Sequence, residues 1–245
     1  MKKGTVGFFD SGIGGTCILD AFRKILPNEN TVYFADRSHC PYGNKTQEEV
    51  LVRADAITNF LIKKHNAKMI VVACNTATAA AIDYLREKYP AIPFVGIEPA
   101  IKPAILHSKT KVVGVLATQG TFNGRLYKET AARFANGTNV IATVADEFVT
   151  LVEEGELEGE RAEKTVREKI EPLLSANADH IVLGCTHFPH LMKVMKKVIN
   201  KRAKIVEPSK AVALRAKSLL EEHNLLNTQS EKGDLIYLYE IPNSN

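Results

Sequence analysis

The stretch Met69-Ile70-Val71-Val72-Ala73-Cys74-Asn75-Thr76 decides how this chain folds. Its first five residues are apolar and three of them are β-branched, which is typical of a strand buried on both faces of a parallel sheet. The strand ends at a cysteine, and a helical pattern follows over residues 77–88. A buried strand that leads through a tight turn into a helix is the repeating unit of α/β folds.

The same alternation of strand and helix continues along the 245 residues. Short β-branched runs predict strands at Thr5–Phe9, Thr31–Ala35, Met69–Ala73, Phe94–Ile97, Lys111–Leu116, Asn139–Val144, His180–Gly184 and Lys204–Glu207. Longer patterns between them predict helices at Gly14–Leu26, Gln47–Lys64, Ala77–Lys88, Gly120–Phe134, Glu160–Leu174, His190–Asn200 and Lys210–Glu222. We therefore predict an α/β protein with mainly parallel sheets flanked by helices.

A weak internal repeat divides this pattern into two halves. Val6–Ser11 resembles Val113–Thr118, which begins 107 residues later, and the stretch around Cys74 resembles the one around Cys185, 111 residues later. Two nearly equal offsets indicate duplication of one α/β unit. We expect two pseudo-symmetric domains with a ligand site in the cleft between them, because sites in α/β sheets lie beyond the carboxyl ends of the strands.

Composition excludes several other classes of protein. The chain is 45% hydrophobic and 24% charged, which is the balance of a globular domain, and its net charge of +4 is scattered, so no nucleic-acid partner is indicated. The first apolar run stops at Asp10, and none approaches the roughly 20 residues of a membrane span, so we expect neither a signal peptide nor a membrane anchor. We expect a cytoplasmic protein whose four cysteines are free thiols.

Two of these cysteines follow buried strands. Cys74 precedes a helix, whose positive end and free backbone N–H groups lower a thiol pKa and can also bind a carboxylate together with Asn75 and Thr76. Cys185 also ends a strand, and His187 is close enough in sequence to polarise its thiol. A small buried side chain at a strand end is the alternative for either cysteine. A metal site is disfavoured because the chain lacks the CxxC spacing of zinc sites.

A glycine-rich turn, Asp10-Ser11-Gly12-Ile13-Gly14-Gly15, follows the first strand. It lacks the Lys-Ser/Thr ending and the third glycine of the two standard phosphate loops, and Asp10 would repel a phosphate. The carboxylate suits an ammonium group, or a second base beside a thiol. A purely structural turn remains the alternative for Asp10 and Ser11.

These motifs together resemble the glutamate racemase family. The residues that carry the resemblance are Asp10-Ser11-Gly12-x-Gly14-Gly15, Pro41-Tyr42-Gly43, Ala73-Cys74-Asn75-Thr76, Gly96-Ile97-Glu98-Pro99-Ala100 and Gly184-Cys185-Thr186-His187-Phe188-Pro189. The resemblance runs from about residue 4 to about residue 215. It departs from the family pattern at Ala145-Asp146, where Cys-Pro is common, and at Glu207-Pro208, where Asp-Ser is usual.

The resemblance implies a fold, an activity and a set of site residues. The expected domains are residues 1–97 plus 208–245 and residues 98–207, and the expected reaction converts L-glutamate to D-glutamate and back, without cofactor or metal, to supply peptidoglycan synthesis. A homodimer is also implied. The proton-transfer pair would be Cys74 and Cys185, with Asp10, Asp36, Glu153 and His187 as supporting acid/base groups. The implied substrate contacts are Asp10, Ser11, Pro41, Tyr42, Gly43, Cys74, Asn75, Thr76, Cys185, Thr186 and His187.

Two thiols fit the chemistry of a racemase. Inverting Cα requires a proton to leave one face of a nearly planar carbanion and another to arrive at the opposite face, so two groups are needed. Proton transfer contributes roughly 10²–10⁴ in rate, and charge stabilisation at the α-carboxylate must supply much of the rest. Three alternatives stay open: a racemase for aspartate, a ligand-binding protein without activity, and a thiol hydrolase, in which one cysteine would suffice.

Overall fold

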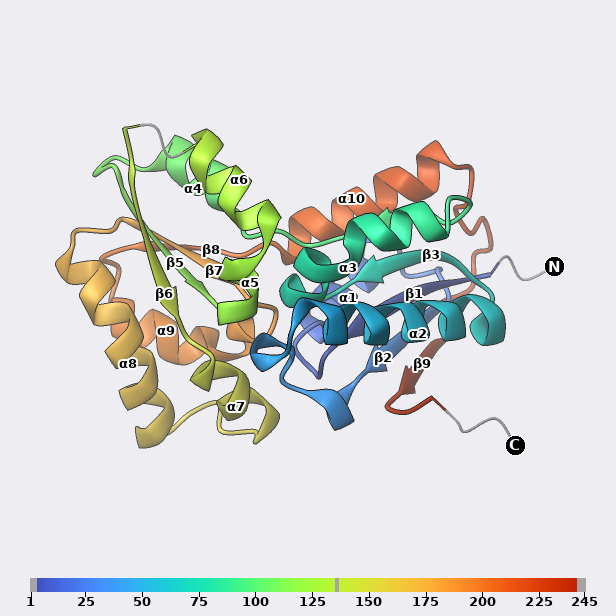
Figure 1. Cartoon of the computed structure of the whole chain (residues 1–245), viewed down its shortest axis with the longest axis horizontal. Coiled ribbons are helices and arrows are strands. Elements are labelled where there is room, and N and C mark those ends of the chain that lie inside the picture. The colour runs from blue at the N-terminus through green and yellow to red at the C-terminus, as the bar shows by residue number, and fades with distance from the viewer. Residues whose placement is uncertain (1–3, 135–136, 242–245) are drawn as a thin grey trace. The chain divides into compact units, whose positions relative to one another are not determined.

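The computed structural model describes residues 4–134 and 137–241 and divides the chain into two compact units (Figure 1). The first unit takes in Met1–Ile97 and Ser209–Asn245, and the second takes in Glu98–Pro208. The family resemblance implied that the chain returns to the first unit at residue 208, and the contacts put that return at Ser209. None of the described helices is both long enough and apolar enough to cross a membrane.

The first unit is built on a parallel sheet in the order β4-β3-β1-β2-β9. Its strands are β1 (Thr5–Asp10), β2 (Thr31–Ala35), β3 (Ala67–Val72), β4 (Phe94–Val95) and β9 (Leu235–Leu238). Its helices are α1 (Thr16–Ile25), α2 (Gln47–His65), α3 (Asn75–Lys88) and α10 (Ser209–Glu222). Helix α1 packs with α10, and α2 packs with α3. The core between the sheet and the first pair includes Phe8, Phe22, Val71 and Leu220.

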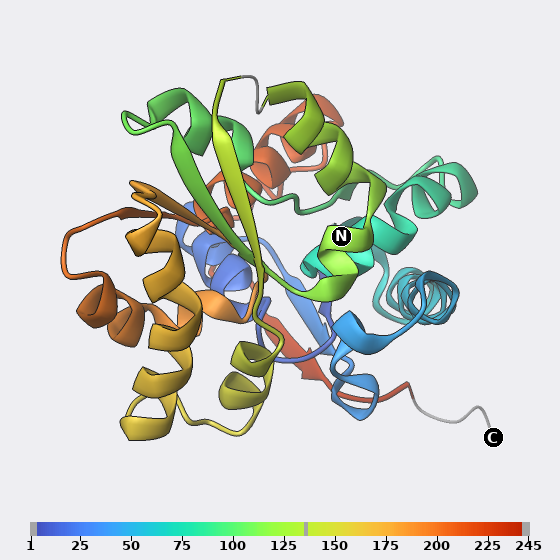
Figure 2. The same cartoon turned by 60° about the vertical axis from the view of Figure 1, so that its left-hand side comes forward.

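The second unit repeats this design with a parallel sheet in the order β6-β5-β7-β8. Its strands are β5 (Val112–Ala117), β6 (Asn139–Val144), β7 (His180–Gly184) and β8 (Lys204–Val206). Its helices are α4 (Ile101–His107), α5 (Gln119–Asn123), α6 (Arg125–Phe134), α7 (Glu147–Glu153), α8 (Glu160–Ser175) and α9 (Met192–Ile199). Helices α4 and α6 cover one face of the sheet, and α8 and α9 pack together on the other (Figure 2).

Strand order confirms the internal repeat that the sequence predicted. In the first unit four neighbouring strands follow the order β2-β1-β3-β4, and in the second unit the order is β6-β5-β7-β8. Strand β1 therefore corresponds to β5 and β3 to β7, as the offsets of 107 and 111 residues require. Cys74 follows β3 and Cys185 follows β7, so the two thiols stand at equivalent ends of equivalent strands.

Some predicted elements differ from the structure. The helix expected at Gly120–Phe134 is two helices, because the backbone is extended at Gly124 (φ −66°, ψ 145°) between α5 and α6. The helix expected from Ala77 begins at Asn75, because Cys74 caps it. Strand β9 was not predicted: its four residues form only a short apolar run, and in the structure it is an edge strand that pairs only with β2 among the described strands and leaves Ile236 exposed.

Candidate active site

The end of β3 carries the first thiol. Cys74 is the N-cap residue of α3, and its Sγ accepts a hydrogen bond from the backbone N–H of Ala77 at 3.5 Å. The side chain is buried, with 5% of the residue exposed. A helix N-terminus favours an anion at this position, because unpaired N–H groups and the helix dipole both point toward it. The structure confirms the predicted placement of this thiol at the start of a helix.

Asn75, the first residue of α3, has a buried and unpaired amide. Neither its Oδ1 nor its Nδ2 has a hydrogen-bond partner among the described residues. Leaving a buried polar group unpaired costs about 1–3 kcal/mol, so native proteins rarely do so without a functional reason. An amide in this state, directly after the Cys74 thiol, indicates a polar ligand at this end of the sheet.

Asp10 lies at the end of the neighbouring strand β1. It is fully buried, and its Oδ2 accepts the backbone N–H of Gly12 at 3.0 Å, inside the glycine-rich turn. Strands β1 and β3 stay paired to this point, because the N–H of Ala73 donates to the carbonyl of Phe9 at 2.7 Å. The Asp10 carboxylate and the Cys74 thiol therefore lie at adjacent strand ends. Ser11 is buried in the same turn.

Close packing of this turn against β3 requires a glycine. A Cβ added at Gly15 would lie 2.7 Å from the carbonyl oxygen of Ala73 and 2.8 Å from its Cβ. The hydroxyl of Tyr33 in β2 holds the turn in place by donating to the carbonyl of Gly12 at 2.8 Å. Gly15 therefore allows the turn to approach the end of β3 closely.

Asp36 follows β2 and is the centre of a hydrogen-bond network. Arg53 of α2 donates to both of its oxygens, from Nη2 to Oδ1 at 2.7 Å and from Nε to Oδ2 at 3.0 Å. The hydroxyl of Tyr42 donates to Oδ2 at 2.6 Å, and Nδ1 of His39 lies 3.0 Å from Oδ1. Burial by itself would raise the pKa of Asp36, but the hydrogen bonds from Arg53 and Tyr42 outweigh it and lower the pKa.

Tyr42 and Gly43 are buried in the loop after Asp36, whereas Pro41 is exposed. Burial and the adjacent Asp36 carboxylate raise the pKa of the Tyr42 phenol far above its usual 10.0, and the Cys74 thiolate adds to the effect. Tyr42 therefore remains a neutral hydroxyl within electrostatic range of the first thiol. Arg53 and His39 were not predicted as parts of the site, because nothing in the local pattern of α2 or of the loop distinguishes them.

The second thiol, Cys185, follows β7 and is 7% exposed. The sequence predicted a helix over His190–Asn200 after this thiol. Instead a turn at Thr186 and His187 leads into a short 3₁₀ helix over Phe188–Leu191, with Pro189 in its first turn, and α9 begins only at Met192. A long helix dipole therefore acts on Cys74, whereas Cys185 has a histidine beside it.

His187 connects Cys185 to Glu153. Its Nδ1 lies 3.8 Å from the sulfur of Cys185, and its Nε2 lies 2.7 Å from Oε1 of Glu153 at the end of α7. The carboxylate favours the tautomer with the proton on Nε2, which leaves Nδ1 as an acceptor for the thiol proton. This contact brings together two residues that are 34 positions apart. Thr186 is buried in the same turn.

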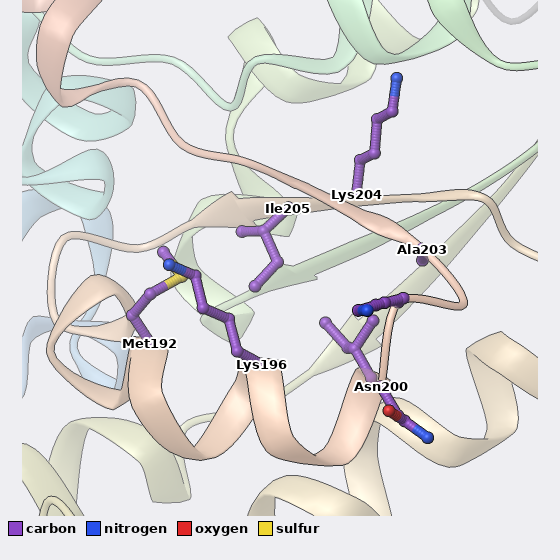
Figure 3. A pocket seen from close by; sticks show the side chains of 8 residues that line it. Met192, Lys196, Asn200, Ala203, Lys204 and Ile205 are labelled. Atoms are coloured by element: carbon purple, nitrogen blue, oxygen red, sulfur yellow. The ribbon is translucent and has the colours of Figure 1, made fainter.

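A hollow on the second unit contains none of the predicted site residues. It has a volume of about 710 Å³ and lies between α9 and β8 (Figure 3). Its lining is formed by Met192, Lys196, Ile199, Asn200, Lys201, Ala203, Lys204 and Ile205. It offers neither a thiol nor a carboxylate for proton transfer, so the candidate chemistry stays at the strand ends around Cys74 and Cys185.

Comparison with known proteins shows which family this chain belongs to. A sequence profile of the Asp/Glu/Hydantoin racemase family matches residues 16–216. The chain belongs to this family. The glutamate racemase of Herpetosiphon aurantiacus is 43% identical over 238 residues, which cover 97% of this chain and 93% of that protein. The glutamate racemase of Clostridium perfringens strain ATCC 13124 is 40% identical over 235 residues, 96% of this chain and 90% of that protein.

Solved structures of the family have the same fold. Glutamate racemase from Francisella tularensis, in complex with D-glutamate, matches with a TM-score of 0.84 at 32% identity, over 99% of this chain and 90% of that one. The Escherichia coli glutamate racemase, with L-glutamate and the activator UDP-MurNAc-ala, matches with a TM-score of 0.86 at 32% identity, over 98% and 91% of the two chains. The α/β fold predicted from sequence is confirmed, and this racemase-family chain is an isomerase.

Proposed function

We propose that this chain interconverts L-glutamate and D-glutamate without a cofactor, by proton transfer at Cα through Cys74 and Cys185. The observation that carries the proposal is the duplicated thiol: each half of the internal repeat has a buried cysteine within two residues of the end of the equivalent strand, β3 or β7. The names of the relatives and the glutamate bound in two solved racemases supply the substrate.

The first thiol is set up as a base by α3. Its sulfur already accepts one backbone N–H, so a thiolate is stabilised before substrate arrives. The unpaired amide of Asn75 and the hydroxyl of Thr76 are suited to hydrogen-bond the substrate carboxylate. Charge that develops on that carboxylate in the transition state is then met by groups already in place, which is the largest source of rate in such reactions.

The second thiol has a different activator. His187 takes the proton of Cys185 at Nδ1 and returns it, and Glu153 holds the ring and stabilises the imidazolium form. Asp10 can support the first thiol in the same way from the end of β1. In this scheme Cys74 exchanges the proton of the D isomer and Cys185 that of the L isomer. The shared cleft expected from the sequence remains a prediction, as does Asp36 as a proton-transfer group.

The biological assignment follows from the product. D-glutamate is used by bacteria for peptidoglycan, so we assign the enzyme to cell-wall synthesis in the cytoplasm, with a homodimer as the expected assembly. These assignments rest on the family resemblance. Specificity for glutamate over aspartate is a difference of one methylene, which is worth only about 1–3 kcal/mol in a binding pocket, and therefore needs a direct measurement.

The deciding experiment uses the purified chain with D- or L-glutamate in D₂O, without added cofactor. Optical rotation should decay to zero from either side while deuterium appears at Cα. Aspartate is run in parallel, and faster exchange with aspartate would reassign the substrate. Rotation that persists with both glutamate enantiomers would remove the proposal.

Single cysteine variants separate the remaining alternatives. Racemisation should be abolished by Cys74→Ser and by Cys185→Ser, whereas Cys17→Ser, in a half-buried cysteine of α1, should leave it unchanged. A thiol hydrolase would depend on only one of the two site cysteines. A binding protein would retain its ligand in both variants and show no turnover.

A further inference from the structure

We propose that Arg53 is a positioning residue of the first half-site: through Asp36 it fixes Tyr42 and the loop that presents Tyr42 and Gly43 beside Cys74. The inference rests on the proposed function and assigns Asp36 a role other than proton transfer. Three side chains from separate elements meet here, with Asp36 after β2, Tyr42 in the following loop and Arg53 on α2.

The contacts of Asp36 leave no position for a substrate proton. An ionised carboxylate offers about four acceptor sites. Four contacts occupy them: two from the Arg53 guanidinium, one from the Tyr42 hydroxyl and one from the His39 ring. The residue is 1% exposed, so water does not compete for those sites. Asp36 is therefore built to hold its neighbours in place.

Arg53 is the partner that makes this arrangement possible. A buried carboxylate is costly unless it is paired and hydrogen-bonded. The planar guanidinium matches the carboxylate with two parallel hydrogen bonds, which fix orientation as well as charge, and a lysine could not reproduce this geometry. The pair lies 17 residues apart in sequence and connects α2 to the loop that follows β2.

Tyr42 transmits the constraint to the site. Its hydroxyl proton is committed to Asp36 at 2.6 Å, and its ring is 1% exposed. Both the hydroxyl and the ring are therefore held, and with them the backbone of Gly43. The short 3₁₀ helix Tyr42–Asn44 packs against α3, whose N-cap residue is Cys74, so the held loop lies against the helix that carries the reacting sulfur. A shift of about 1 Å in a positioning group can lower a rate by about 100-fold.

The hollow beside Arg53 provides a direct test. A cavity of about 420 Å³ is lined by His39, Lys45, Thr46, Glu48, Glu49, Val52 and Arg53, and a quarter of the Arg53 side chain is exposed. In Arg53→Ala, kcat for glutamate racemisation should fall about 10- to 100-fold. Millimolar guanidinium chloride, which can enter from this hollow, should restore a substantial part of the loss. Urea has the same shape without the charge and should restore none.

Two further variants keep the test decisive. Arg53→Lys retains the charge but loses the paired geometry, and kcat should fall by less than in Arg53→Ala. Tyr42→Phe removes the hydroxyl, and its loss in kcat should not add to that of Arg53→Ala in the double variant, because both break one chain of contacts. Should Arg53→Ala fail to fold, the Lys variant and its double variant with Tyr42→Phe carry the same comparison.

Arg23→Ala is the matched control. Arg23 is likewise a hydrogen-bonded arginine of the first unit, with three hydrogen bonds to Thr31, Gly233 and Asp234, but it lies at the opposite end of β2. It should lower stability and leave kcat unchanged. The inference would be overturned if the wild type is active and Arg53→Ala has the same kcat. It would also be overturned if kcat falls in Arg53→Ala and guanidinium does not restore it. An inactive wild type would instead overturn the proposed function.

Discussion

Replacing Asn75 by leucine should raise the stability of the free protein and weaken its binding of glutamate. Leucine has nearly the shape of asparagine, and it removes two buried polar atoms that have no partner among the described residues. Removing an unpaired buried polar group should raise the free energy of unfolding by about 1–3 kcal/mol. Each kcal/mol corresponds to about 2–4 °C in Tm for a chain of this size. We therefore expect Asn75→Leu to raise the Tm of the free protein by roughly 2–12 °C.

The response to substrate should change in the opposite direction. Glutamate at 100 times its Kd should stabilise the wild type by about 2.7 kcal/mol. The Asn75→Leu variant should gain far less, because the amide that would bind the substrate is gone. Calorimetry of both proteins, with and without D-glutamate, measures the two effects together.

Thr58→Val is the matched control for this prediction. The hydroxyl of Thr58 is likewise buried without a partner among the described residues, but it lies in the middle of α2. Its replacement should raise stability while leaving the glutamate effect intact. A less stable Asn75→Leu protein that is still protected by glutamate would refute the reasoning, because the amide would then be a structural group.

Three other perturbations have expected outcomes. Glu153→Gln removes the negative charge beside His187, and kcat should fall about 10- to 100-fold in a polarimetric assay of both directions; an unchanged rate would separate this pair from the chemistry. Gly15→Ala places a Cβ 2.7 Å from a backbone carbonyl just after β3 and should lower the free energy of unfolding in urea by about 1–3 kcal/mol. Burial alone would raise the pKa of Asp179, but hydrogen bonds, first from His180, lower it below 3.8. The ionised Asp179 therefore stabilises the fold fully above about pH 4, and this stabilisation is lost as the pH falls further. In Asp179→Asn the free energy of unfolding should depend less on pH below about pH 4.

Much of the fold was predictable because buried parallel strands are nearly continuous apolar runs. The fully buried strands β2 and β7 begin and end at the residues that the sequence indicated, and so does the edge strand β6, which is β-branched but not buried. The misses have physical causes. Strand β9 has four residues and α7 has seven, and elements this short do not give a strong periodic signal.

The candidate site was predictable in part for a similar reason. Thiols and carboxylates that follow strands are visible in sequence, because the strand itself is visible, and Cys74 and Asp10 are examples. Arg53 was not visible: it is one of many charged residues on a long helix, and only the folded chain brings it to Asp36. The contact between Glu153 and His187 is equally non-local, and the sequence offered it only through family resemblance.

The first unit is interrupted in the chain, which has a consequence for how the enzyme is made. Helix α10 supplies Val212, Ala213, Ala216 and Leu220 to the core beneath β1 and β3, and it is translated after every residue of the second unit. Domains generally fold as units during synthesis, N-terminal first, but here the N-terminal one must wait while the later one is completed on the ribosome. A chain released before residue 209 would therefore contain every residue of the second unit but leave the core of the first unit uncovered and prone to aggregation.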